Sequence, residues 1–145
     1  MTYYLSLGSN LGDREATLRQ AIHLIEQQIG HVLRCSSFYY SKPWGFTSQN
    51  DFCNLCCAVE SDKTPLEVLH LTQHIERALG RKKKTLISNL RSPIYSDRNI
   101  DIDLIRVFDE QEQEICLDTP ELTLPHKFWQ QRDFVKTPLG EIMQP

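Results

Sequence analysis

Long apolar runs are absent from this chain of 145 residues. No stretch approaches the roughly 20 apolar residues of a membrane-spanning helix. The N-terminus also lacks the basic region and hydrophobic core of an export signal. We therefore expect a cytoplasmic protein with no membrane partner. Low-complexity runs and linkers are absent too, which favours a single domain over residues 1–145, and we expect it to be a monomer.

An excess of positive charge is also absent. The net charge of −3 and a pI near 5.9 give no general attraction to nucleic acid, so we expect no nucleic-acid partner. The basic residues are instead concentrated locally, in the run from Arg81 to Lys84 and in Arg91 and Arg98 further on. Such a run is either a solvated loop or a clamp for polyphosphate, and its place just before an acidic strand favours the clamp.

The number of cysteines does not suit a disulfide framework. Five cysteines, an odd number, in a chain without an export signal indicate reduced thiols. Cys53 and Cys56 have the spacing of a zinc motif, but residues three apart on a strand face opposite sides, and no second ligand pair follows. Buried cysteines that pack as small hydrophobic residues explain the spacing better.

The most informative segment runs from Arg98 to Leu104. Strict alternation in it places Asp101 and Asp103 on one strand face, roughly 6 to 7 Å apart, and the apolar Ile100, Ile102 and Leu104 on the other. Aspartates on a strand usually lie on its solvated face. Aspartate is nevertheless depleted in strands, and two like charges on one face repel unless a cation lies between them. Mg²⁺ bound by carboxylates and substrate phosphates is therefore the functional alternative.

Hydrophobic periodicity and boundary signals predict a βαββαβ core. Thr64 and Pro65 mark one helix start, with Glu67 completing a capping box, while Gly30 and Gly80 mark two helix ends. This is the ferredoxin-like order, hence an α+β fold with a mainly antiparallel sheet. We expect a functional loop over 81–98, a short strand near 114–117, a short helix ending near 132 and then a tail. The predicted core strands are 2–7, 31–40, 52–60 and 101–108, and the predicted helices are 13–29 and 65–79.

Two further patterns suggest ligand contacts. The segment from Gly8 to Gly12 lies between a strand and a helix; it is either a phosphate cradle or, more in keeping with its sequence, a tight turn. Phe52 and Asn54 share a strand face, so a ring and a planar amide point into one space and suit a flat heterocycle with an amide-like edge. Aromatic residues at such a place are more usually core.

Six segments in order resemble the 6-hydroxymethyl-7,8-dihydropterin pyrophosphokinase family. They are Gly8-Ser-Asn-Leu-Gly-Asp-Arg14, Ser36-Ser-Phe-Tyr-Tyr-Ser-Lys-Pro-Trp-Gly45, Asp51-Phe-Cys-Asn54, Ile75-Glu-Arg-Ala-Leu-Gly-Arg81, Asp97-Arg-Asn-Ile-Asp-Ile-Asp103 and Leu124-Pro-His126 through Arg132-Asp-Phe134. The resemblance covers nearly the whole chain. It implies a ferredoxin-like fold and transfer of pyrophosphate from ATP to the pterin hydroxymethyl group, with release of AMP, in folate biosynthesis.

The resemblance also implies roles for individual residues. Asp101 and Asp103 match the ligands of two Mg²⁺ ions, and Arg98, Arg81 and Lys83 match groups that offset charge on the transferring phosphates. The positions that match the pterin site are Ser41, Trp44, Phe52, Asn54 and Phe134. The positions that match the ATP site are Gln73, Glu76, Arg81, Lys83, Tyr95, Arg98, Leu104, Thr123, His126 and Arg132.

The chain departs from the family pattern mainly before the acidic strand. It has Tyr95-Ser-Asp-Arg98 where the family usually has Trp-Gly-Pro-Arg, Lys42 in place of a proline, and Glu121 where a basic residue is common. Two alternatives remain open: a catalytically weakened paralogue that binds nucleotide or pterin, and an RNA-binding module with the same element order, whose aromatic signature is absent.

Overall fold

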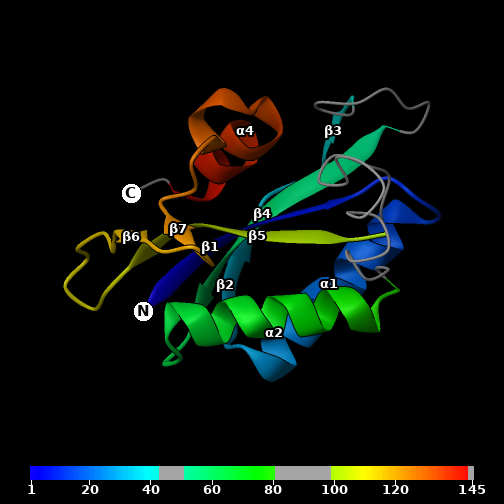
Figure 1. Cartoon of the computed structure of the whole chain (residues 1–145). Coiled ribbons are helices and arrows are strands. Elements are labelled where there is room, and N and C mark those ends of the chain that lie inside the picture. Colours follow the sequence, from blue (N-terminus) through cyan, green and yellow to red (C-terminus); the bar gives the residue numbers. More distant parts are fainter. Residues whose placement is uncertain (43–50, 81–98, 144–145) are drawn as a thin grey trace.

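The protein folds around one antiparallel sheet. The computed structural model describes residues 1–42, 51–80 and 99–143. The strand order is β2-β4-β1-β5, and β3 pairs with β4 beside β2, which confirms the predicted ferredoxin-like arrangement (Figure 1). The strands of this sheet are β1 (Thr2–Ser9), β2 (His31–Cys35), β3 (Tyr39–Ser41), β4 (Phe52–Glu60) and β5 (Asp101–Phe108).

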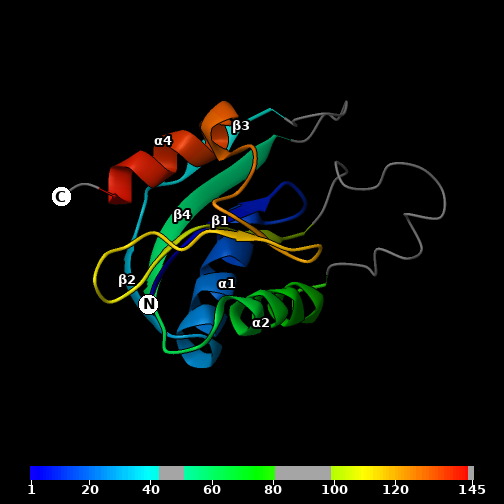
Figure 2. The same cartoon turned by 60° about the vertical axis from the view of Figure 1, so that its left-hand side comes forward.

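Helices cover both faces of the sheet. Helices α1 (Arg14–Gln28) and α2 (Pro65–Ala78) lie on one face and α4 (Asp133–Ile142) on the other (Figures 1 and 2). Each face has its own apolar cluster, because alternate residues of every strand point to opposite sides. The larger cluster packs the sheet against α1 and α2, and the smaller one packs it against α4.

The helix boundaries follow from local chemistry. Asp13 caps α1 by accepting a hydrogen bond from the Ala16 N–H. At α2, the Thr64 hydroxyl accepts from the Glu67 N–H while the Glu67 carboxylate accepts from the Thr64 N–H, so the predicted capping box is confirmed. Gly80 follows α2 with a positive φ of 99°, a conformation that glycine adopts without strain.

Two predicted elements of the core differ in detail. The single strand predicted over 31–40 is wrong: the chain leaves the sheet after Cys35 and returns at Tyr39, giving β2 and β3. The first strand extends to Ser9, so Gly8 lies inside β1 and only Gly12, with a φ of 64°, belongs to the following turn. Burial alternation could not reveal the break, because β2 is largely exposed along its length.

The C-terminal third differs more. The strand predicted over 114–117 is instead an isolated bridge at Glu114 and a short pair of strands, β6 (Leu117–Asp118) and β7 (Thr123–Leu124). The predicted helix near 132 is only a 3₁₀ turn, η1 (Trp129–Gln131). The predicted tail is the helix α4, which sequence reasoning missed because Pro138 inside it is a helix-breaking signal.

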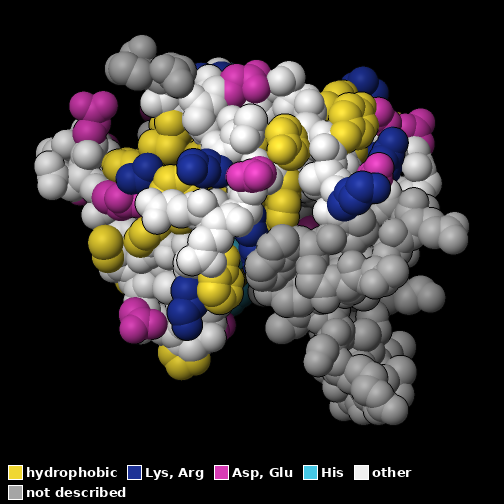
Figure 3. Space-filling model, turned by 90° about the horizontal axis from the view of Figure 1, so that it is seen from above, with side chains coloured by type: hydrophobic (Ala, Val, Ile, Leu, Met, Phe, Trp, Pro, Cys, Tyr) yellow, Lys and Arg dark blue, Asp and Glu magenta, His cyan; other side chains and the backbone are white. Residues whose placement is uncertain are grey.

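The surface carries mixed charge. Figure 3 looks down on the side of α4 and shows acidic and basic side chains interspersed with apolar ones over the part of this face that is described. None of the helices in the described segments is both long and apolar enough to cross a membrane. Cys53 and Cys56 are both fully buried, in the clusters on opposite faces of the sheet, as their spacing predicts.

Candidate functional site

Strand β5 presents its two aspartates on the α4 side of the sheet. Across the ladder with β1, Asp101 lies opposite Gly8 and Asp103 opposite Ser6. The side chains of Ile100, Ile102 and Leu104 are almost completely buried, and they pack in the large cluster under α1 and α2. The predicted alternation along this strand is therefore confirmed.

A third carboxylate lies close to this acidic pair. Glu76 of α2 is only 6% exposed, and its Oε2 accepts a hydrogen bond of 2.7 Å from the Ile102 N–H. Burial raises the pKa of Asp103 well above its usual range, and the charges of Asp101 and Glu76 raise it further, while Arg132 acts in the opposite direction. Negative charge is thus concentrated here beyond what Arg132 offsets, and a bound cation would relieve it.

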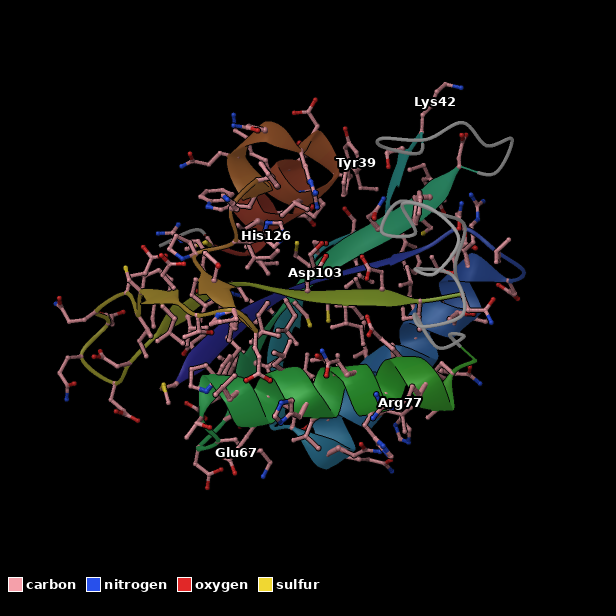
Figure 4. All side chains as sticks on the ribbon, in the orientation of Figure 1. Tyr39, Lys42, Glu67, Arg77, Asp103 and His126 are labelled. Atoms are coloured by element: carbon pink, nitrogen blue, oxygen red, sulfur yellow. The ribbon has the colours of Figure 1, made fainter. Side chains whose placement is uncertain are left out.

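Basic side chains reach the acidic face from the C-terminal segment. The His126 N–H donates to the Ile105 carbonyl at 2.8 Å, which fixes this segment against β5. Burial lowers the pKa of His126 and nearby Arg132 lowers it further, while Asp101 raises it. Figure 4 shows Asp103 and His126 together between the sheet and α4, with Glu67 and Arg77 on α2 across the sheet.

Arg132 lies at the start of α4 between two aromatic rings. Its guanidinium carbon is 5.5 Å from the ring centre of Phe128 and 5.9 Å from that of Phe134, and the residue is only 8% exposed. At these distances the guanidinium is attracted to the faces of both rings. Phe134 is partly buried and packs against the smaller cluster.

A second group of polar atoms lies at the other end of the same face. The Asn54 amide nitrogen donates to the Ser41 hydroxyl at 3.0 Å and to the Tyr39 carbonyl at 3.5 Å. Asn54 lies opposite Gly8 in the sheet, and a Cβ on Gly8 would be 2.6 Å from the Asn54 Oδ1. The absence of a side chain at Gly8 therefore leaves room for the Asn54 amide. Phe52 lies opposite Ser41 on the same face.

The structure places the other predicted site residues as follows. Gln73 precedes Glu76 by one helical turn on α2, and Thr123 is exposed in β7. The side chain of Leu104 is 3% exposed and packs in the core under α1 and α2. The predicted residues that lie outside the described residues are Trp44, Arg81, Lys83, Tyr95 and Arg98.

Sequence reasoning missed the groups that hold α4 in place. The Arg34 Nε donates to the carbonyl of Ile142 at 2.7 Å, and Glu141 accepts from both the N–H and the hydroxyl of Ser37 at 2.9 Å. These contacts join the strand β2 and the chain after it to the helix whose first turn carries Phe134. They link residues more than a hundred positions apart in the chain, and no sequence signal marks them.

The donor set on this face suits one class of metal. Among the described residues no group of three or more His, Cys, Asp and Glu side chains is arranged to hold a metal ion. Asp101 and Asp103 instead provide two carboxylates on one face. Mg²⁺ is commonly held by one or two carboxylates with water and substrate phosphates completing its shell, so the residues fit Mg²⁺ better than zinc.

Comparisons with known proteins agree on one family. Residues 4–144 match the model of 7,8-dihydro-6-hydroxymethylpterin-pyrophosphokinase (HPPK). A 2-amino-4-hydroxy-6-hydroxymethyldihydropteridine pyrophosphokinase of Porphyromonas gingivalis is 43% identical over 141 residues, covering 96% of this chain and 88% of that protein. The protein of the same name from Bacillus subtilis is 36% identical over 142 residues, covering 97% and 77%.

Solved structures share the fold. A chain described as HPPK-DHPS in complex with substrates superposes with a TM-score of 0.67 at 15% identity over 98% of this chain. A Plasmodium falciparum HPPK-DHPS chain gives a TM-score of 0.63 at 16% identity over 97%. This chain spans 40% of the length of each of those two chains.

Proposed function

The chain belongs to the HPPK family. From this premise we propose that ATP and Mg²⁺ bind at Asp101 and Asp103, at one end of the sheet face beneath α4, and that the pterin binds at Asn54, at the other end. The protein is a diphosphokinase that transfers pyrophosphate to the hydroxymethyl group of 6-hydroxymethyl-7,8-dihydropterin in folate biosynthesis. In our proposal ATP is the donor and AMP is the second product. The RNA-binding alternative and the weakened paralogue are not favoured by the family match.

One observation carries the proposal: an acidic pair and a hydrogen-bonded amide, Asn54, share one sheet face. Asp101 lies opposite Gly8, and Gly8 in turn lies opposite Asn54 on the other neighbouring strand. Three adjacent strands thus line up a carboxylate, a glycine without a side chain and a planar amide. A phosphate-bearing substrate at the carboxylates and a flat heterocycle at the amide would meet over β1.

The pterin end is proposed to bind through shape and hydrogen bonds. Asn54 presents an amide that can both donate and accept, and Ser41 fixes its orientation. Phe52 and Phe134 approach this face from β4 and α4, and we assign them to stacking on the pterin ring. We include Trp44 in this pocket from the family pattern alone.

The nucleotide end is proposed to bind through charge. Asp101 and Asp103 would hold two Mg²⁺ ions, which when bound neutralise phosphate charge and orient the phosphate oxygens. His126 interacts electrostatically with Asp101, and Arg132 with Asp103, and we assign both to the phosphates. From the family pattern we add Gln73, Glu76, Thr123, Tyr95, Arg81, Lys83 and Arg98 to the ATP site.

The catalytic contribution of these side chains is mainly positioning. Attack by the pterin hydroxymethyl oxygen on the β-phosphorus needs both substrates held in line, and Asn54 and the aromatic rings fix one of them. Arg132 and the basic residues Arg98, Arg81 and Lys83 are assigned to the charge that accumulates on the phosphates during transfer. We further propose that this single domain acts as a monomer in the cytoplasm.

An assay of AMP release tests the proposal. Purified protein is incubated with ATP, MgCl₂ and 6-hydroxymethyl-7,8-dihydropterin, and AMP is followed by chromatography. We expect AMP to form only when pterin and Mg²⁺ are both present, and to fall by at least about a hundredfold in Asp103→Ala. Asp62→Ala, an exposed change in the turn before α2, is the matched control and should leave the rate unchanged. Binding of both substrates without AMP would instead identify a weakened paralogue.

A further inference from the structure

Two cysteines face each other across the edge of the sheet. Cys35 at the end of β2 is the ladder partner of Cys57 in β4. The next residue, Ser36, donates its N–H to the Cys56 carbonyl at 2.8 Å. Hydrogen-bonded and non-hydrogen-bonded pairs alternate in an antiparallel ladder, so Cys35 and Cys57 form a non-hydrogen-bonded pair. Their Cα atoms are then about 4.5 Å apart, within the range that a disulfide spans.

The two thiols have opposite environments. Cys35 is exposed to solvent, whereas Cys57 is fully buried in the core under α1 and α2. The neighbouring thiol of Cys57 lowers the pKa of Cys35. The neighbouring thiol of Cys35, together with burial, raises the pKa of Cys57. One member of the pair is thus accessible and more readily ionised, as a reactive cysteine must be, and the other is held beside it.

We propose that Cys35 and Cys57 are an oxidisable dithiol that peroxides convert into a cross-strand disulfide. The Cys35 thiolate attacks one peroxide oxygen, the O–O bond breaks, and a sulfenic acid and hydroxide form. The Cys57 sulfur then attacks the Cys35 sulfur, the S–O bond breaks, and the Cys57 proton and the departing hydroxide leave as water. In total, two thiols lose two electrons and two protons, and hydrogen peroxide is reduced to two molecules of water.

The place of this pair determines what the bond would do. The disulfide would close the segment 35–57, which contains β3 and the part of β4 with Asn54. Cys57 packs in the large cluster, so both sulfurs lie on the face of the sheet that α1 and α2 cover. The bond would therefore form on the face opposite to Asp101 and Asp103. It would fasten the edge strand β2 to its neighbour and restrict the unfolded chain. This inference is independent of the proposed function.

Peptide mapping tests the proposal directly. The purified protein is treated with an equimolar amount of hydrogen peroxide, blocked with iodoacetamide and digested without reduction. We expect a peptide that joins Cys35 to Cys57, two hydrogen atoms lighter than its parts and separated again by dithiothreitol. The apparent Tm of the oxidised protein should rise by roughly 5 to 10 °C. Cys35→Ser should abolish the linked peptide, and Cys116→Ser, a change at the other exposed cysteine, should not.

Cys57→Ser places a hydroxyl at a fully buried position and would itself disturb the core. The decisive comparison therefore uses the wild-type chain. The linked peptide should form about tenfold faster in buffer than in 8 M urea, since folding supplies the proximity of the two thiols. Absence of the linked peptide, a predominant link to another cysteine or to a second chain, or faster formation in urea would each overturn the proposal.

Discussion

Replacing Asp103 by asparagine should stabilise the protein while abolishing its activity. In the absence of a divalent cation, Asp103 is a largely buried carboxylate that faces the negative charges of Asp101 and Glu76. Asparagine keeps the shape of the side chain and removes the charge. Side chains two residues apart on a strand are roughly 6.6 Å apart, and two unit charges at that distance repel by about 2.5 kcal/mol at an effective dielectric constant of 20.

Arg132 offsets part of this repulsion, so the net gain is smaller than the pairwise figure. We expect Asp103→Asn to add about 1 to 2 kcal/mol to the free energy of unfolding without cation. For a chain of this length that gain corresponds to a rise in Tm of roughly 3 to 6 °C. Pterin-dependent AMP formation should be lost in the same variant, because a neutral amide is a poor ligand for Mg²⁺.

The stability gained by Asp103→Asn should increase as the pH rises. The pKa of Asp103 is raised in the folded protein, so between its unfolded and folded values the folded state binds more protons. The stability of the wild type therefore falls as pH rises through that window. The advantage of Asp103→Asn should be absent at pH values below the unfolded pKa, grow as the pH rises and level off above the folded pKa.

Differential scanning fluorimetry in EDTA, at a series of pH values, measures this difference. Asp62→Asn is the control, because Asp62 is an exposed aspartate in the turn before α2 and its replacement should shift Tm by less than about 1 °C. A lower Tm for Asp103→Asn than for the wild type at pH 8, or an advantage that shrinks with rising pH, would refute the argument that charge is concentrated at this site.

Three further changes test single contacts. Gly8→Ala puts a Cβ 2.6 Å from the Asn54 Oδ1, so calorimetry should show pterin affinity reduced by at least about tenfold and ATP affinity unchanged. Glu76→Ala leaves the buried Ile102 N–H without its acceptor, so urea unfolding should find it about 1 to 3 kcal/mol less stable than Glu76→Gln. Arg34→Ala removes the donor to the last carbonyl of α4, so amide exchange should quicken in α4 and not in α2.

The core elements could be predicted because their signals are local. The capping box at Thr64 and the alternation from Ile100 to Leu104 depend on residues a few positions apart, and both are present in the structure. The break between β2 and β3 and the helix α4 could not be predicted. β2 is exposed along most of its length and therefore has no burial pattern, and Pro138 hides a helix that tertiary contacts stabilise.

The sequence by itself determined the βαββαβ order of the core and the family to which the chain belongs. Two aspartates with a spacing of two must share a face of a strand, and the six ordered segments identify a pyrophosphokinase family that the comparisons confirm. These conclusions need only the period of a strand and the identity of the residues.

Only the tertiary structure decided which residues from distant parts of the chain are neighbours. It placed Asn54 across from Gly8, Glu76 against the backbone of β5, and Cys35 opposite Cys57. Such neighbours come from strand register and helix packing, which join residues distant in the chain. A shift of one residue in register would move every side chain of a strand to the other face, and the sequence alone does not state the register.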